Sequence, residues 1–178
     1  MSKLIAFVGV GNMGCPMAEN LMKSGKVVKV FDVSEKMLQM AKNKNLETVD
    51  NLNDLITADV DTVITMLPEG KHSKEVYLGE KGIINKVSKS CLLIDCSTID
   101  IQTSIEIGKK AAEKGINMID APVSGGVMGA QKATLNIMVG GSKDAFEKAL
   151  PLLKIMGKNI FHAGDLGSGN GAKICNNM

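Results

Sequence analysis

The sequence contains no arginine and no tryptophan, and only 3% of its 178 residues are aromatic. Proteins that bind nucleic acids rely on arginine forks and on aromatic side chains that stack on bases. These absences argue against a nucleic-acid partner, although the formal net charge is +2. No apolar run approaches the roughly 20 residues that a transmembrane helix needs. We therefore expect no membrane partner either.

The cysteines show no spacing typical of a metal site. None of Cys15, Cys91, Cys96 and Cys175 stands in a CxxC pair, and none has a histidine close by in the sequence. Paired cysteines at short spacing usually mark structural zinc sites or disulfide frameworks. We therefore expect no metal and no disulfide, and we interpret the four cysteines as buried thiols.

The N-terminal segment leads directly into an apolar strand pattern. It has neither the small-residue cleavage site of a secretory signal nor the Arg-rich, Ser-rich composition of a transit peptide. The sequence therefore predicts a cytoplasmic protein. The mitochondrial matrix is the alternative for a processed eukaryotic protein.

Apolar runs alternate with segments of helical periodicity along most of the chain. Hydrophobic residues make up 44% of the sequence and charged residues 22%, as in an ordinary globular domain. This alternation is typical of βαβ units, so it predicts a Rossmann-type, doubly wound α/β fold with a mostly parallel sheet. The expected strands span 4–10, 27–33, 60–67, 91–97, 116–120 and 135–141, and the expected helices span 15–25, 34–45 and 101–115.

A glycine-rich loop follows the first expected strand and opens the first expected helix. Its sequence, GVGNMG, has the GxGxxG spacing of dinucleotide-binding loops. Gly9 permits the tight turn, Gly11 lets the backbone approach a pyrophosphate, and Gly14 lets helix and strand pack closely. The free N–H groups of the helix N-terminus then attract the anion. The predicted cofactor loop consists of Gly9, Val10, Gly11, Asn12, Met13 and Gly14.

Asp32 ends the second expected strand, about twenty residues after the loop. A carboxylate at this place accepts hydrogen bonds from the ribose hydroxyls of NAD and repels the 2′-phosphate of NADP. NADP sites usually recruit an arginine here, and the sequence has none. We therefore predict NAD as the cofactor, in preference to S-adenosylmethionine, a flavin or an incidental glycine turn.

Three further polar loops follow expected strands, at the sheet edge where open parallel sheets collect their ligands. They read MLPEGKHS (66–73), DCSTID (95–100) and DAPVSGG (120–126). Ser124, Gly125 and Gly126 offer a hydroxyl and a bare backbone whose N–H groups can bind a carboxylate without arginine. A plain turn between two strands is the alternative interpretation of this last loop.

Together with the C-terminal segment AKICNNM, these motifs resemble the β-hydroxyacid dehydrogenase family. The resemblance spans residues 7–178. Two positions depart from it: Ala133 stands where many relatives have glycine, and His72 stands where asparagine is common near the nicotinamide. The resemblance implies an NAD-binding domain over residues 1–165 and the start of an interdomain catalytic helix over 166–178. It also implies that the family's all-helical second domain is absent from this chain.

The resemblance further implies functions for single residues. Lys173 would be the general acid or base, although in isolation it would be interpreted as a solvated lysine on a helix face. Asn177, one helical turn further, would orient the substrate, and residues 124–126 would bind the substrate carboxylate. The remaining cofactor contacts that we predict are Met66, Leu67, Pro68, His72, Ser97 and Thr98.

The activity that the resemblance implies is NAD-dependent oxidation of 3-hydroxyisobutyrate to methylmalonate semialdehyde, in valine catabolism, by a full-length homo-oligomer. Tartronate semialdehyde reduction, or another reaction of the family, is the alternative, and a non-catalytic NAD-binding fragment is an alternative of another class. We also expect the helix from residue 170 to fray, because it is short and because Ile174 and Met178 lack partner helices. The 178-residue chain alone should then be inactive.

Overall fold

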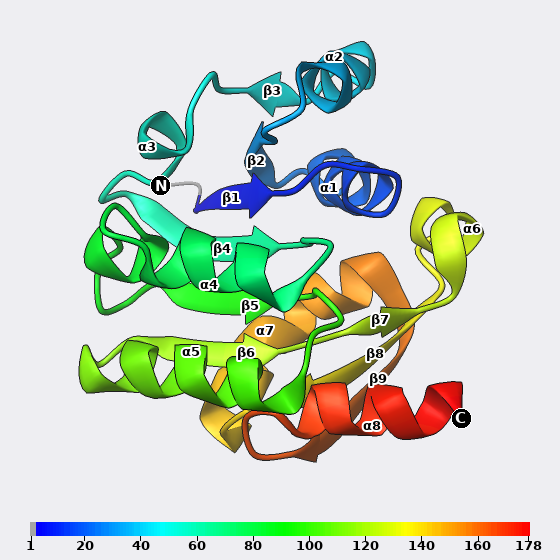
Figure 1. The fold of residues 1–178 in the computed structure, drawn as a ribbon. Helices are drawn as coiled ribbons and strands as arrows, with labels where there is room; N and C mark the ends of the chain where they lie inside the picture. Colours follow the sequence, from blue (N-terminus) through cyan, green and yellow to red (C-terminus); the bar gives the residue numbers. More distant parts are fainter. Residues whose placement is uncertain (1–2) are drawn as a thin grey trace.

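The computed structural model describes residues 3–178, which form a nine-stranded sheet covered by helices on both faces (Figure 1). From one edge of the sheet the strand order is β3-β2-β1-β4-β5-β6, and β8 comes next. β8 pairs with both β6 and β7 along one of its sides and with β9 along its other side. The strands are β1 (Leu4–Val8), β2 (Val27–Phe31), β3 (Glu47–Thr48), β4 (Val60–Thr65), β5 (Leu92–Asp95), β6 (Asn117–Asp120), β7 (Val123–Ser124), β8 (Leu135–Gly140) and β9 (Gly157–Gly164). The helices are α1 (Gly14–Lys23), α2 (Glu35–Asn43), α3 (Leu52–Leu55), α4 (Gly70–Leu78), α5 (Ile101–Glu113), α6 (Gly126–Gln131), α7 (Lys143–Met156) and α8 (Ser168–Asn177), with a 3₁₀ turn η1 (Ile83–Asn85).

The sheet is parallel except around β8. All pairings from β3 to β6 are parallel, as is the pairing of β8 with β9, whereas β8 runs antiparallel to β6 and β7. Only α6 and a short turn connect β7 to β8, so β8 returns directly beside β7 and runs antiparallel to it. A parallel neighbour would need a longer crossover connection. The predicted doubly wound, mostly parallel α/β fold is confirmed.

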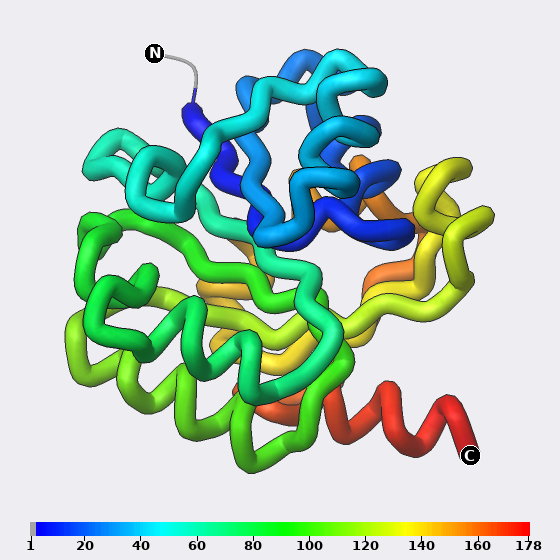
Figure 2. Tube along the Cα trace, turned by 45° about the horizontal axis from the view of Figure 1, so that its top comes forward, coloured from blue at the N-terminus to red at the C-terminus, as the bar shows by residue number. Residues whose placement is uncertain are grey.

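Each face of the sheet buries its own hydrophobic core, because alternate side chains of a strand point to opposite faces. Ile5 and Phe7 of β1 pack in the core that includes side chains of α1 and α7. Their neighbours Ala6 and Val8 pack in the core that includes side chains of α3, α4 and α5. Figure 2 shows α4 and α5, in green, on the near side of the sheet and the orange trace of α7 behind it. Burial on both faces explains why the strands are continuous apolar runs.

The six expected strands all form, and each is somewhat shorter than its apolar run. The sequence did not predict β3, β7 and β9. The first two have only two residues each. β9 has little apolar character, and most of its residues are exposed, so its sequence lacks the pattern of a buried strand.

The ends expected for the helices 15–25 and 101–115 are confirmed to within two residues, and a glycine follows each of them. After α1 and α5 the chain reaches Gly25 and Gly115, which have φ angles of 93° and 74°. Only glycine adopts this left-handed conformation without a steric penalty, so both positions stop a helix cleanly.

The four cysteines are all free thiols, as expected, but only three of them are buried. The expectation was wrong for Cys175, which lies exposed on α8. Within residues 3–178 no three His, Cys, Asp or Glu side chains gather in a way that could hold a metal ion. Across the same residues, none of the helices has the length and apolar character needed to span a membrane.

Candidate functional site

The glycine-rich loop is built around two close approaches of backbone to backbone. Gly9 has a φ of 94°, and a Cβ on it would lie 2.2 Å from the carbonyl oxygen of Met66. A Cβ on Gly14 would lie 1.9 Å from the carbonyl oxygen of Gly9. A Cβ on Gly11, in contrast, would meet nothing within 4 Å, so this backbone faces open space. Two of the three glycines are thus required by the fold, and Gly11 leaves room for a ligand.

Asp32 joins the glycine-rich loop to the end of β2. Its Oδ2 accepts a hydrogen bond of 2.9 Å from the N–H of Val10, and its Oδ1 accepts one of 2.8 Å from the N–H of Ser34. Each oxygen keeps a lone pair free, because a carboxylate oxygen can accept two hydrogen bonds. The carboxylate is therefore held in place by the backbone and still able to bind a ribose hydroxyl.

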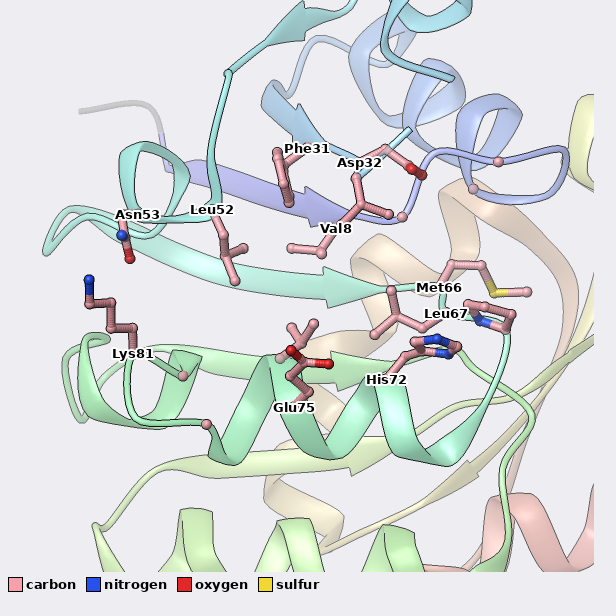
Figure 3. Close-up of a pocket in the computed structure, with 18 of the residues that line it drawn as sticks. Val8, Phe31, Asp32, Leu52, Asn53, Met66, Leu67, His72, Glu75 and Lys81 are labelled. Carbon is pink, nitrogen blue, oxygen red and sulfur yellow. The ribbon is translucent and has the colours of Figure 1, made fainter. Parts of the chain in front are cut away.

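A cavity of about 810 Å³ opens beside this loop (Figure 3). Asp32, Met66 and His72 lie at one end of it, and Asn53 and Lys81 lie at the other. Mostly apolar side chains line the stretch between these two ends, and the carboxylate of Glu75 lies among them. The predicted cofactor contacts that line the cavity are Gly9, Gly11, Asn12, Met13, Gly14, Asp32, Met66, Leu67, Pro68 and His72.

His72 contributes a polar atom that still lacks a partner. Its Nδ1 is buried, and no group among residues 3–178 forms a hydrogen bond with it. Buried polar atoms almost always have a partner, so an unpaired one in a cavity wall favours a ligand contact at this place.

The remaining predicted cofactor contacts lie outside the cavity lining. Val10 is fully buried, and its N–H binds Asp32. Ser97 is also fully buried, and its hydroxyl accepts a hydrogen bond of 2.8 Å from the N–H of Leu67. The Ser97 side chain thus holds the lining residue Leu67 in place, and its own contact with the cofactor stays a prediction. Thr98 is exposed, and its contact with the cofactor stays a prediction.

About half of the cavity wall was missed by sequence reasoning. Val8 and Phe31 immediately precede the motifs, so their position at strand ends could have signalled them. The residues from α3, α4 and the turn after α4 have no local signal, because only the tertiary fold brings them to this face. The missed lining residues are Val8, Phe31, Val33, Leu52, Asn53, Glu75, Val76, Gly79, Glu80, Lys81 and Gly82.

A buried hydrogen-bond chain supports the loop that carries Met66 and Leu67. The Thr65 hydroxyl donates to Asp95 Oδ1 at 2.9 Å and lies 2.7 Å from the Tyr77 hydroxyl, which therefore donates to it. Asp95 Oδ1 also accepts from the N–H of Ser97 at 3.0 Å. Burial raises the pKa of the Asp95 carboxyl above its usual range. The chain of contacts fixes the ends of β4 and β5, and with them the cavity rim.

The first turn of α8 is attached to the sheet through Asp120. Its Oδ1 accepts a hydrogen bond of 2.8 Å from the N–H of Gly167, and its Oδ2 accepts one of 2.8 Å from the N–H of Asn170. Asn170 is itself buried, and its Oδ1 accepts a hydrogen bond of 3.0 Å from the N–H of Ile99. The expectation that α8 would be unsupported is therefore wrong for its first turn. Further along, Ile174 and Met178 are 43% and 100% exposed, as expected.

The predicted catalytic and substrate-binding residues lie apart from the cavity lining. Lys173 is partly exposed and Asn177 is exposed, both on α8. Ser124 ends β7, and Gly125 and Gly126, with φ angles of 134° and 65°, begin α6. Their positive φ angles explain the two glycines, but the functions of all five residues stay predictions.

Comparison with known proteins identifies the family. Residues 4–164 match the model described as the NAD binding domain of 6-phosphogluconate dehydrogenase. The chain belongs to this family. It is 48% identical over 174 residues to 3-hydroxyisobutyrate dehydrogenase of Pseudomonas aeruginosa, a match that covers 98% of this chain and 58% of the relative. It is 43% identical over 176 residues to NAD-dependent L-serine dehydrogenase of the same species, covering 99% of this chain and 59% of that relative.

A solved structure gives the same result. The structure of Mycobacterium tuberculosis 3-hydroxyisobutyrate dehydrogenase with L-serine superimposes with a TM-score of 0.94 at 39% identity, covering 100% of this chain and 60% of that one. The resemblance expected from the motifs is confirmed. The chain spans about three-fifths of the length of the Pseudomonas and Mycobacterium proteins.

The geometry of this NAD-binding domain suits its cofactor. Gly11 leaves the approach to the helix N-terminus open, Asp32 offers free lone pairs, and His72 offers an unpaired nitrogen. Lined largely by apolar side chains, the cavity of about 810 Å³ has the size of a small-molecule site. The prediction of NAD as cofactor is confirmed.

Proposed function

We propose that the protein catalyses NAD-dependent oxidation of 3-hydroxyisobutyrate to methylmalonate semialdehyde, a step of valine catabolism. The observation that supports this most directly is the 48% identity to 3-hydroxyisobutyrate dehydrogenase of Pseudomonas aeruginosa over 98% of the chain. A cytoplasmic or mitochondrial location and assembly into a homo-oligomer are part of the same proposal. The relatives from mouse and Dictyostelium discoideum are named as mitochondrial.

Each predicted site residue has a chemical task in this reaction. NAD, when bound, accepts the hydride. Lys173 takes the proton of the substrate hydroxyl, and returns it when the reaction runs in reverse. Asn177 lies four residues further along α8, on the same face, and orients the hydroxyl. The backbone N–H groups of Gly125 and Gly126 and the hydroxyl of Ser124 bind the carboxylate, which fixes the reacting carbon.

L-Serine is the second candidate substrate. A relative at 43% identity is named NAD-dependent L-serine dehydrogenase, and the Mycobacterium structure contains L-serine. Serine and 3-hydroxyisobutyrate share a carboxylate and a hydroxyl on the carbon two positions away, so the same residues can hold both. They differ at the carbon between the carboxylate and the hydroxyl-bearing carbon, which has an amino group in serine and a methyl group in 3-hydroxyisobutyrate.

The test is a comparison of kcat/KM for the two acids with saturating NAD, in the protein expressed from its full reading frame. We expect 3-hydroxyisobutyrate to exceed L-serine by at least tenfold, and a reversed order would replace the proposed substrate by serine. Tartronate semialdehyde with NADH is assayed in parallel, because its faster turnover would identify the reductase alternative. Binding of NAD without turnover of any of these compounds would show a non-catalytic NAD-binding module.

A further inference from the structure

The helix that contains Lys173 has no side chain of its own at its N-cap. Gly167 occupies that position with a φ of 92°, and there is no capping hydrogen bond from a side chain of α8. Helix N-termini leave their first N–H groups unpaired, and an Asp, Ser, Thr or Asn side chain at the N-cap usually accepts from one of them. In α8 this acceptor comes from another part of the fold.

Asp120, at the end of β6, supplies that acceptor. It is 1% exposed, and its two oxygens accept from the N–H of Gly167 and from the N–H of Asn170, both at 2.8 Å. Asn170 is the third residue of α8, which is where an N-cap side chain would bind. The carboxylate therefore caps the helix from the sheet, 47 and 50 residues away from its two partners.

The backbone around the first turn of α8 is closely packed. A Cβ on Gly169 would lie 2.5 Å from the carbonyl oxygen of Met138, and a Cβ on Gly140 would lie 2.3 Å from Asp120 Oδ1. On the other side Asn170 Nδ2 donates to Ser104 Oγ of α5 at 2.9 Å. The first turn of α8 is thus fixed against β6, β8 and α5 together.

Asn170 and Lys173 are three residues apart, so they lie on the same side of α8, one turn from each other. The contacts that fix the direction of the helix axis at Asn170 therefore also determine the position of Lys173 Nζ. A displacement of about 1 Å in a catalytic group costs on the order of 10²-fold in rate.

We propose that Asp120 is a positioning residue for the reaction: its buried carboxylate holds the first turn of α8 and thereby places Lys173. This inference rests on the proposed function of Lys173. Asp120 itself exchanges no proton with the substrate.

The first test uses the 178-residue chain. Hydrogen exchange is measured in the wild type, in Asp120→Asn and in Asp144→Asn, a control that makes the same chemical change at an exposed site on α7. Asparagine keeps one accepting oxygen and places an NH₂ group against the other of the two N–H donors, so one of the two hydrogen bonds is lost. We therefore expect the α8 amides to exchange at least tenfold faster. The control should leave them unchanged. Exchange within twofold of the wild type in Asp120→Asn would overturn the attachment.

The second test is a double-mutant cycle on turnover, in the protein expressed from its full reading frame. We expect Asp120→Asn to lower kcat by about 10- to 100-fold while the Kd of NAD stays within threefold. In the background of Lys173→Ala the same substitution should lower kcat by less than twofold, because Asp120 then has no base to place. A merely structural function would lower kcat equally in both backgrounds, and that result would overturn the proposal.

The two proposals fail in different ways. If Lys173→Ala leaves turnover unchanged, the proposed function of Lys173 is wrong, and the positioning inference falls with it. If Lys173→Ala abolishes turnover while Asp120→Asn does not reduce it, only the positioning inference is wrong.

If the Asp120→Asn protein binds less than half an equivalent of NAD, it is not properly folded, and Ser104→Ala is used in its place because Ser104 also holds Asn170. This milder variant should lower kcat two- to fivefold in the wild-type background alone, and an equal loss in both backgrounds would overturn the inference.

Discussion

Asp95 and Asp120 are Cα partners in the parallel register of β5 and β6, so their side chains leave the sheet on the same face. Both carboxylates are 1% exposed. Asp95 binds the N–H of Ser97 and the hydroxyl of Thr65, beside the cavity, whereas Asp120 binds the N-terminus of α8. The end of β5 thus holds the cavity rim and the end of β6 holds the start of α8, each through one buried carboxylate.

The buried carboxyl of Asp95 predicts a distinctive pH dependence of stability. Burial raises its pKa in the folded state, whereas in the unfolded chain aspartate titrates near ~3.9. The folded state therefore binds the proton more tightly, and the wild type gains stability relative to Asp95→Asn as the pH falls from neutral toward ~4. It loses this advantage as the pH rises through the raised pKa.

Urea unfolding of the wild type and of Asp95→Asn between pH 7 and pH 4.5 measures this effect. Within the window the difference in unfolding free energy should change by at most about 1.4 kcal/mol for each pH unit. Asp144→Asn, at an exposed position, is the matched control. A difference that is constant with pH would contradict the prediction.

The same added methyl group should lower stability at Gly9 and cofactor affinity at Gly11. Gly9→Ala places a Cβ 2.2 Å from the Met66 carbonyl oxygen at a positive φ, so we expect a loss of about 2–4 kcal/mol in unfolding free energy. Gly11→Ala meets no protein atom within 4 Å and should unfold like the wild type, yet bind NAD at least tenfold more weakly. Thermal unfolding and calorimetric titration separate the two effects. Normal NAD affinity in Gly11→Ala would show that the pyrophosphate does not pass over this residue.

Asp32 should decide between the two nicotinamide cofactors. The carboxylate repels a 2′-phosphate, and the chain has no arginine to neutralise that phosphate, so NAD should bind at least tenfold more tightly than NADP. Asp32→Ala should narrow the gap, mainly by weakening NAD. Calorimetric titration of both cofactors against both proteins checks this, and equal affinities in the wild type would be incompatible with it.

Lys173 should affect turnover and leave cofactor affinity alone. In the protein expressed from its full reading frame, Lys173→Ala should lower kcat by about 10²–10⁴, the usual share of general acid–base catalysis. The Kd of NAD should change less than threefold, because Lys173 does not line the cavity. Turnover close to the wild type would exclude Lys173 as the base.

The sequence predicted those parts of the molecule that depend on neighbouring residues. The glycine-rich loop and Asp32 could be found because their spacing is local, and the buried strands because their apolar runs are continuous. The attachment of α8 could not be found, because Asp120 meets its partners through the tertiary fold alone. The α3 and α4 side of the cavity could not be predicted for the same reason, because these residues meet the glycine-rich loop only in the tertiary fold. The sequence alone therefore also predicted, wrongly, that the first turn of α8 lacks support.

The two edges of the sheet differ in a way that matters for handling the protein. β3 is an edge of only two residues, whereas β9 offers eight, and within residues 3–178 no strand pairs with its outer side. Long open edges are templates for strand addition, and charged side chains are the usual protection. Here Phe161, 56% exposed, stands in the middle of β9. Concentrated solutions should therefore associate through this edge, and Phe161→Lys should raise the concentration at which light scattering first increases.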